Sequence, residues 1–271
     1  MSINYRAVVI GCGKIGALWG LDPARTQPAS WAGALQAHAK VDVVGLVDRD
    51  SQTLAKATEA YGVEGYSDAR DAVEKLKPDV VIIATPPDSH EELLALMLEL
   101  TVPFIVCEKP LTTTVESAER MVKAAVGHKV LVNHQRRFFP LYKAAQKRIA
   151  DGELGEIVKA TGHYSKGLLN NGSHLIDIVF YMVPQKKMPL EFVVHDDSEE
   201  IHDLILEGTK GTLKITHLGY RFEWPGGAEE DVRSMLEPSV SHIVECLDGT
   251  AMPLCTPEDG LKVIRALSVY Q

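Results

Sequence analysis

Continuous apolar runs alternate with amphipathic stretches through the first half of the chain. The runs lie at residues 7–10, 80–84 and 104–107, with mostly apolar segments at 41–47, which contains Asp42, and at 129–133, which has Lys129 and Asn133 at its ends; the amphipathic stretches lie at 31–38, 51–61, 67–75, 89–100 and from 113. Runs without polar positions are typical of parallel strands buried on both faces, and helices supply the crossovers between such strands. The pattern predicts a domain over residues 1–133 with an α/β fold and a doubly wound parallel sheet.

The pattern changes after Asn133, where the spacing of apolar positions shifts toward two. Alternating segments predict strands at 156–164, 190–195, 201–207 and 211–218, with a hairpin connection over 208–211. Helices are expected at 140–150, 239–247 and 257–270, the last with Thr256 as its N-cap and Pro257 at its first position. We therefore expect a second domain over residues 134–271, an α+β fold with a mostly antiparallel open sheet.

The first apolar run leads into Gly11-Cys12-Gly13-Lys14-Ile15-Gly16, which has G-x-G-x-x-G spacing. In a dinucleotide-binding unit, Gly11 allows the tight turn, Gly13 lets the backbone approach a pyrophosphate, and Gly16 lets the helix pack on the strand. The free N–H groups at the start of the helix then face the phosphates. The glycine spacing alone is weak evidence for dinucleotide binding, because glycine-rich turns are common. It becomes stronger evidence when the motifs downstream of it agree.

Residues 18–30 interrupt the expected first crossover with two proline steps, Asp22-Pro23 and Gln27-Pro28. We interpret them as a loop inserted into the connection, with the helix resuming at Trp31. Long loops in compact domains are often functional. A solvated excursion without a function explains the same residues equally well.

The second apolar run ends in Asp48-Arg49. An acid at the end of this strand can accept both ribose hydroxyls of an adenosine, and it repels the additional phosphate of NADP. Arg49 can stack on adenine or meet a 2′-phosphate. The competing interpretation is that Asp48 or Asp50 only caps the following helix. The interval from Gly11 exceeds the usual ~20 residues, and the inserted loop accounts for the excess.

Two later strands lead into turns rich in polar residues and proline. The first turn is Thr85-Pro86-Pro87, with His90 at the start of the next helix, and the second is Glu108-Lys109-Pro110. Doubly wound folds bind ligands at the carboxyl edge of the sheet, so we expect both turns to contact the cofactor. His90 is either a further cofactor contact or only a residue of the first helical turn.

Composition and charge limit the class of protein. The chain has 271 residues, 45% hydrophobic and 24% charged, and a formal net charge of −9, which argues against nucleic acid as a partner. No apolar segment approaches the roughly 18 residues that span a bilayer, so no membrane partner is expected. The four cysteines are scattered without metal-ligand spacing. We therefore expect no metal and a cytoplasmic location.

The combination of these motifs is more specific than any one of them. The glycine turn, Asp48, the Thr85-Pro86-Pro87 turn, Glu108-Lys109-Pro110 and a second sheet domain together resemble the Gfo/Idh/MocA oxidoreductases, the glucose–fructose oxidoreductase and inositol dehydrogenase family. The segment Asn170-Asn171-Gly172-Ser173-His174-Leu175-Ile176-Asp177 is similar to the family segment that carries a histidine and two flanking acids. The resemblance covers most of the chain.

The resemblance implies NAD, with NADP as the alternative, in the first domain, and a sugar, cyclic polyol or nucleotide sugar on the second. Lys109 is similar to the lysine that bonds the reacting oxygen, and His174 to the histidine that accepts a proton or orients the substrate. The family often has Asp where this chain has Asn170, so His174 or Lys109 must serve as the base. Asp177 lies one helical turn beyond His174, on the same face.

This chemistry needs those residue types. Oxidation of a secondary alcohol removes a hydride, which the nicotinamide takes, and a proton, which the protein must accept. Histidine titrates near neutrality, and a lysine beside the oxygen stabilises alkoxide charge. The competing interpretations are a solvated loop lysine for Lys109 and a helix residue buried against the sheet for His174.

Several expectations have weaker support. Further candidate substrate contacts are Arg137, Tyr164, Lys166, Asn170 and Asp177, and residues 165–170 and 222–231 are expected to be loops that set specificity. Alternative functions are a nucleotide-sensing regulator without turnover and an enzyme for a non-sugar carbonyl or diol. Because the open face of a small sheet is often covered by self-association, we expect a homodimer or homotetramer.

Overall fold

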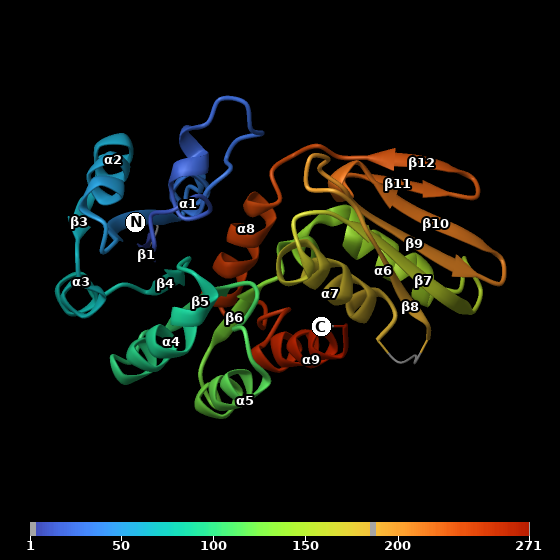
Figure 1. Ribbon diagram of the computed structural model, residues 1–271. Coiled ribbons are helices and arrows are strands. Elements are labelled where there is room, and N and C mark those ends of the chain that lie inside the picture. The colour runs from blue at the N-terminus through green and yellow to red at the C-terminus, as the bar shows by residue number, and fades with distance from the viewer. Residues whose placement is uncertain (1–3, 185–187, 271) are drawn as a thin grey trace. The chain divides into compact units, whose positions relative to one another are not determined.

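The computed structural model describes residues 4–184 and 188–270, and its contacts divide the chain into two compact units (Figure 1). Unit 1 contains residues 1–135 and Arg233–Ile264, and unit 2 contains Arg136–Val232 and 265–271. The first boundary falls two residues after the expected one. Residues 233–264, however, group with unit 1 although the sequence analysis assigned them to the second domain. Near their end, the Val132 N–H donates to the Cys255 carbonyl at 3.0 Å.

Unit 1 is built on a parallel sheet of six strands in the order β3-β2-β1-β4-β5-β6. The strands are β1 (Tyr5–Ile10), β2 (Val41–Val47), β3 (Glu64–Tyr66), β4 (Val80–Ile83), β5 (Phe104–Glu108) and β6 (Val130–Asn133). Every residue of β4, β5 and β6 is buried, as their apolar runs predict. The strand order reverses between β1 and β4, the position where doubly wound sheets bind ligands. The short edge strand β3 was not predicted.

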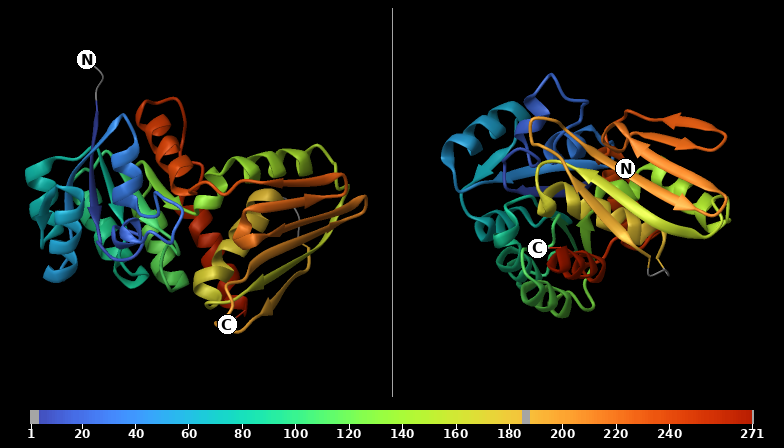
Figure 2. Two further views of the ribbon diagram at one scale, coloured as in Figure 1. Left: turned by 90° about the horizontal axis from the view of Figure 1, so that it is seen from above. Right: turned by 45° about the vertical axis from the view of Figure 1, so that its right-hand side comes forward.

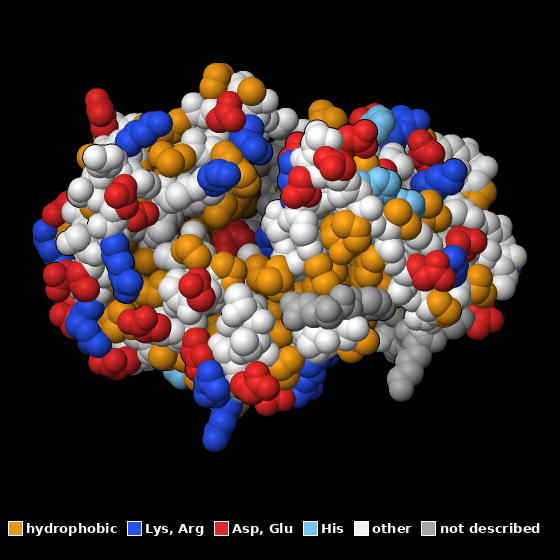
Figure 3. Space-filling view, in the orientation of Figure 1, with side chains coloured by type: hydrophobic (Ala, Val, Ile, Leu, Met, Phe, Trp, Pro, Cys, Tyr) orange, Lys and Arg blue, Asp and Glu red, His pale blue; other side chains and the backbone are white. Residues whose placement is uncertain are grey.

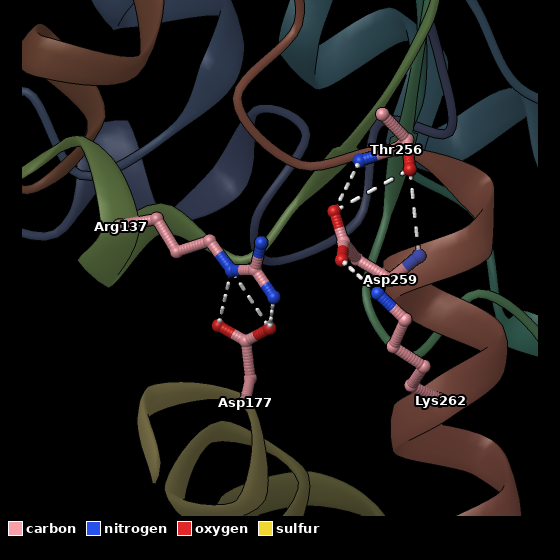
Figure 4. Close-up of polar contacts among 5 residues, drawn as sticks. All are labelled: Arg137, Asp177, Thr256, Asp259 and Lys262. Atoms are coloured by element: carbon pink, nitrogen blue, oxygen red, sulfur yellow. Dashed lines mark hydrogen bonds and ion pairs between the residues drawn. The ribbon is translucent and has the colours of Figure 1, made fainter. Parts of the chain in front are cut away.

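Helices cover both faces of this sheet, as the two views of Figure 2 show. They are α1 (Trp31–Ala37), α2 (Ser51–Tyr61), α3 (Ala69–Leu76), α4 (His90–Glu99), α5 (Val115–Ala124), α8 (Leu236–Leu247) and the first part of α9 (Pro257–Tyr270). The expected cap of α9 is present (Figure 4). The Thr256 N–H donates to the Asp259 carboxylate at 3.1 Å, and the Asp259 N–H donates to the Thr256 hydroxyl oxygen at 3.4 Å. Such a reciprocal cap satisfies N–H groups that the helix leaves free.

The first crossover is a helix joined from two separate pieces. A turn over residues 14–17 follows the glycines, the chain leaves through the short helix η1 (Leu18–Leu21), and α1 then begins. The N–H groups of Trp31 and Ala32 donate to the carbonyls of Ile15 and Gly16 at 2.8 and 2.9 Å. Helical hydrogen bonding therefore continues from the turn at residues 14–17 into α1, although the inserted loop separates the two in the sequence. These hydrogen bonds hold α1 next to the glycine turn.

Unit 2 is a six-stranded sheet in the order β12-β11-β10-β9-β7-β8, covered on one face by helices α6 (Pro140–Ala150) and α7 (Ser173–Met182). The strands are β7 (Ile157–Tyr164), β8 (Leu190–Val194), β9 (His202–Gly208), β10 (Gly211–Thr216), β11 (Arg221–Trp224) and β12 (Gly227–Glu230). All neighbours are antiparallel except β7 and β8. This confirms the predicted mixture of a parallel and a mostly antiparallel sheet.

One expected loop of unit 2 is a strand pair instead. Residues 222–231 form most of the β11–β12 hairpin, in which Trp224 is opposite Gly227. The prediction was wrong because Pro225-Gly226 provides a two-residue turn and the flanking residues pair in register. Residues 165–170 do lie in a connection, which ends in the single helical turn η4 (Leu168–Gly172) before α7.

The described residues contain no helix with both the length and the apolar character needed to cross a membrane. All four cysteines are buried, and none of them forms a disulfide bond within the described residues. Within residues 4–184 and 188–270, no three acidic, histidine or cysteine side chains gather in a way that could hold a metal ion.

Candidate functional site

The three glycines of the first turn meet different surroundings. Gly11 has φ +94°, and a Cβ there would lie 2.8 Å from the Ala84 carbonyl. A Cβ on Gly16 would lie 1.8 Å from the Gly11 oxygen. A Cβ on Gly13, by contrast, meets nothing within 4 Å. Packing within the protein therefore requires glycine at 11 and 16, whereas the space beside Gly13 is available to a ligand.

The same turn presents main-chain donors. In the described part of the chain, the N–H groups of Gly13, Lys14, Ile15 and Gly16 donate to no acceptor. Lys14 is exposed and Ile15 is half-buried. Successive free N–H groups at the start of a helical turn favour an anion. The turn therefore fits the pyrophosphate of a dinucleotide, as its glycine spacing predicts.

Asp48 lies beside the turn at the end of β2. Its Oδ2 accepts the Cys12 N–H at 2.7 Å, and its Oδ1 accepts the Asp50 N–H at 2.9 Å. The cap of α2 is Asp50, which accepts from the Thr53 N–H at 2.7 Å. Because each carboxylate oxygen accepts more than one hydrogen bond, Asp48 retains capacity for ribose hydroxyls. Arg49 is exposed next to it.

His90 is fully buried, with 0% of its surface exposed. Its Nδ1 lies 3.1 Å from the Leu111 carbonyl and its Nε2 lies 2.9 Å from the Thr85 carbonyl. Both ring nitrogens therefore have partners within the protein. The imidazole joins the Thr85-Pro86-Pro87 turn to the residues after Lys109, which favours a structural role over direct contact with a cofactor.

The Glu108-Lys109-Pro110 turn is held by a buried carboxylate. Glu108 is 6% exposed, and its Oε1 accepts the indole N–H of Trp31 at 2.8 Å and the amide of Asn133 at 2.7 Å. Its Oε2 accepts the Lys109 main-chain N–H at 3.0 Å. Lys109 itself is half-buried, and its peptide bond to Pro110 is cis. Sequence reasoning missed Trp31 and Asn133, because nothing in the order of residues pairs them with Glu108.

In unit 2, Arg137 and Asp177 form a buried ion pair (Figure 4). The guanidinium Nε donates to both carboxylate oxygens at 3.0 and 3.1 Å, and Nη2 donates to Oδ1 at 2.7 Å. The two side chains are 6% and 1% exposed. Both were expected to contact substrate. The structure pairs them with each other, an arrangement that fixes α7 against the segment before α6.

His174 lies on α7, three residues before Asp177, and is buried. Its ring meets the ring of His202, on β9, edge to face at a centroid distance of 5.8 Å. Sequence reasoning did not select His202, which stands in an ordinary alternating strand. The pair brings two imidazoles together at the face of the sheet that the helices cover.

The remaining candidates in unit 2 differ in exposure. Tyr164 is buried, its ring edge meets Phe192 at 5.7 Å, and burial raises the pKa of its hydroxyl. Asn170 is exposed, and its carbonyl accepts the Ser173 hydroxyl at 2.7 Å. Lys166 is exposed and donates to Asp197 through its main-chain N–H and its ammonium group. These contacts place Asn170 and Lys166 on the surface and Tyr164 inside the unit.

The open face of the second sheet carries a cluster of titratable side chains. The Nδ1 of His163 lies 3.1 Å from the Nε2 of His195, and His163 is opposite Asp203 on the neighbouring strand. Burial raises the pKa of Asp203, although the three histidines His163, His217 and His195 act against that shift. In Figure 3, histidine side chains lie among acidic and basic ones over β7–β12, with hydrophobic side chains nearby.

Comparisons with known proteins agree with this description. Residues 5–135 match the family whose description is "Oxidoreductase family, NAD-binding Rossmann fold". An inositol 2-dehydrogenase of Corynebacterium glutamicum (strain R) is 29% identical over 266 residues, 90% of this chain and 74% of that protein. An inositol 2-dehydrogenase of Arthrobacter sp. (strain FB24) is 36% identical over 162 residues, 58% of this chain and 44% of that protein. The chain thus spans less than half of the second relative's length.

Solved structures share the fold over nearly the whole chain. A 3-ketoreductase from Actinomadura kijaniata in complex with NADP and TDP-benzene has a TM-score of 0.78 at 18% identity, covering 98% of this chain and 96% of that one. The WlbA dehydrogenase from Bordetella pertussis in complex with NADH and UDP-GlcNAcA has a TM-score of 0.79 at 19% identity, covering 98% and 94%. At this level of identity the likeness establishes the fold alone.

Proposed function

We propose that the chain is an NAD-dependent oxidoreductase of the Gfo/Idh/MocA family, because residues 5–135 match the model of that family and an inositol 2-dehydrogenase is 29% identical over 90% of the chain. The proposed reaction transfers a hydride between the nicotinamide and a hydroxyl or carbonyl of a sugar, cyclic polyol or nucleotide sugar. The observation that carries the proposal is the turn at Gly13. It combines free main-chain N–H groups, open space and an adjacent carboxylate at the switch point of a parallel sheet.

The proposed cofactor site consists of residues at the carboxyl ends of four neighbouring strands of unit 1. The N–H groups of the glycine turn hold the pyrophosphate, and Asp48 accepts the ribose hydroxyls. The residues that complete this site are Gly11, Lys14, Ile15, Gly16, Arg49, Thr85, Pro86, Pro87, Glu108 and Lys109. When bound, the nicotinamide supplies the hydride chemistry, and the protein supplies position and proton transfer.

The proposed catalytic residues are Lys109 and His174. The lysine ammonium stabilises negative charge on the reacting oxygen, and the histidine accepts or donates the proton. Because Asn170 is an amide that takes up no proton, the base function falls to His174 or Lys109. Tyr164 and Asn170 are proposed to contact the substrate, and Arg137 and Asp177 are proposed to act by holding α7 in place.

The first test follows nicotinamide absorbance during incubation with polyols, free sugars and nucleotide sugars, for the wild type and Lys109→Met. We expect turnover with at least one member of the panel. Methionine keeps the length of the side chain without its charge, so we expect turnover to fall on the order of a hundredfold or more, as when one oxyanion donor is removed. NADH affinity, measured separately by fluorescence titration, should stay within about threefold of wild type.

The competing functions give different results in the same experiment. Tight NADH binding without turnover across the panel supports a regulator that senses the nucleotide. When simple carbonyls and diols are added to the panel, turnover with these compounds alone supports an enzyme outside carbohydrate chemistry. Absence of NADH and NADPH binding would remove the basis of the proposal.

We also propose that the chain forms a homodimer or homotetramer through the open face of the second sheet. The exposed Val193 on β8 is opposite His163 on β7, so its side chain lies on this open face beside the histidine cluster. Covering an apolar surface of this kind is favourable in water. Sedimentation at micromolar concentration tests this, and a monomer at that concentration would contradict it.

A further inference from the structure

Trp31 begins α1 and is fully buried, although no motif in the sequence includes it. Its indole N–H is the one polar group of the side chain, and it donates to Glu108 at 2.8 Å. A buried indole N–H almost always requires an acceptor. Here the acceptor is the residue immediately before Lys109. The contact therefore connects the first crossover helix to the turn that carries the proposed catalytic lysine.

Asn133 makes the second contact to the same carboxylate oxygen, at 2.7 Å. Glu108 and Asn133 are register partners on β5 and β6. Because a carboxylate accepts hydrogen bonds, the Asn133 amide must present its NH₂ group to Glu108, and its carbonyl oxygen is left buried without a partner. An unsatisfied buried oxygen is unfavourable. In this orientation the Asn133 amide contributes a donor to the carboxylate of Glu108.

The Lys109 backbone is held on both sides. Before it, Glu108 Oε2 accepts the Lys109 N–H at 3.0 Å, and beyond it, His90 Nδ1 lies 3.1 Å from the Leu111 carbonyl. Trp31 and Asn133 fix one oxygen of Glu108, and the other oxygen fixes the Lys109 main chain. The direction in which the lysine side chain leaves the turn is therefore determined by contacts from α1 and β6.

We propose that Trp31 is a positioning residue for Lys109: its indole N–H orients Glu108, and Glu108 in turn orients the lysine. This inference rests on the proposed role of Lys109. A displacement of a reacting group by about 1 Å can cost on the order of a hundredfold in rate, so a contact this far from the chemistry can control turnover. The proposed role belongs to the indole N–H group. The substitution Trp31→Phe tests it, because phenylalanine keeps an aromatic ring in the buried position but has no N–H to donate to Glu108.

The test compares Trp31→Phe, Glu108→Gln and their combination in the full chain, with Tyr61→Phe as the control. Tyr61 supports the same start of α1 through Ser30 and the Ala17 carbonyl but does not contact Glu108. We expect Trp31→Phe to lower kcat at least about tenfold with substrate KM and NADH affinity within about threefold of wild type. Tyr61→Phe should keep kcat within about twofold. The combined variant should lose less than the product of the two single losses, because both act on one contact.

A second measurement reports the contact without turnover. Labelling tryptophan with nitrogen-15 gives an indole signal for each of the three tryptophans, Trp19, Trp31 and Trp224. Trp31→Phe identifies one signal by its loss, and Glu108→Gln should shift that signal and speed its hydrogen exchange while the other two stay in place. Glu108→Gln keeps the size of the side chain, so this measurement stands even where Trp31→Phe folds poorly.

The outcomes separate the two proposals. Normal kcat in Trp31→Phe together with an inactive Lys109→Met would overturn the positioning role and leave the proposed function intact. An indole signal unmoved by Glu108→Gln, or losses that multiply in the combined variant, would also overturn it. Full turnover in Lys109→Met would refute the proposed role of the lysine, and the positioning inference would fall with it even if the indole signal moved.

Discussion

The two units hold their candidate residues in different ways. In unit 1, the candidate residues lie at strand ends, and main-chain geometry positions them. Gly11 allows the turn, and the absence of a side chain at Gly16 lets the main chain approach the Gly11 carbonyl closely. In unit 2, a side-chain ion pair between Arg137 and Asp177 holds the helix that carries His174. The first arrangement depends on steric fit, and the second depends on charges removed from water.

This difference predicts different sensitivities. A site fixed by main-chain geometry fails when a side chain occupies the wrong space, whereas a site fixed by a buried ion pair fails when either charge is left alone. Glu108 is the exception in unit 1, because it is a buried carboxylate whose three hydrogen-bond donors are all uncharged N–H groups. Unit 1 therefore also positions one candidate residue through a buried carboxylate, but neutral N–H donors hold that carboxylate in place of an opposite charge.

The largest expected effect comes from breaking the ion pair of unit 2. Arg137→Met leaves Asp177 buried without its partner, and breaking a buried pair typically costs about 3–5 kcal/mol of unfolding free energy. Urea denaturation measures it, with Arg221→Met as the control, because the Arg221–Glu223 pair is exposed and such pairs contribute roughly 0–1 kcal/mol. Equal losses in the two variants would contradict the assignment. Arg137→Met combined with Asp177→Leu should recover much of the stability.

The glycine turn offers a contrast within unit 1. A methyl group at Gly16 collides with the Gly11 carbonyl, so Gly16→Ala should lower the melting temperature, with a cost of about 1–3 kcal/mol for overpacking. Gly13→Ala adds a methyl group where nothing lies within 4 Å, so the melting temperature should hold while NADH binding weakens at least about tenfold. Thermal unfolding and fluorescence titration of the two variants measure this. If Gly13→Ala binds NADH normally, the pyrophosphate does not lie at Gly13.

The charge of Asp48 is expected to set the choice of cofactor. Asp48→Asn keeps an oxygen for the Cys12 N–H but removes the repulsion of a 2′-phosphate. The wild type should bind NADH more tightly than NADPH, and the substitution should reduce that ratio about tenfold, which corresponds to about 1.4 kcal/mol. Dissociation constants for both nucleotides provide the measurement. Tighter NADPH binding by the wild type would overturn the role of Asp48.

The smallest expected effect concerns Asp203 on the open face of unit 2. Burial raises the pKa of its carboxyl, so the folded state favours the neutral form. The stability associated with a raised pKa is present at low pH and lost as pH rises through the folded value. Asp203→Asn stays neutral, so its melting temperature should exceed that of the wild type at pH 7 by about 1–3 °C, and the difference should vanish below about pH 4. A difference of equal size at both pH values would exclude ionisation as its cause.

Strand positions and the glycine turn followed from local pattern. Buried apolar runs became β1, β4, β5 and β6, and the switch of period marked the start of the second sheet. Strand pairing between distant segments was harder to anticipate. The edge strand β3 has only three residues, and the β11–β12 hairpin has too few apolar positions to stand out from a loop.

The sequence by itself determined the doubly wound sheet and the glycine turn, because the period of apolar residues and the spacing of glycines are local properties. Tertiary structure alone decided which groups the polar residues of the candidate site form hydrogen bonds with. His90 and Arg137 resembled ligand contacts in the sequence, but they bond to Thr85, Leu111 and Asp177. Trp31 was expected only as the start of a helix, but its indole N–H donates to Glu108 across 77 positions. Such partners are chosen by proximity in the folded chain, where each buried polar group must find a donor or acceptor, and no local pattern encodes that choice.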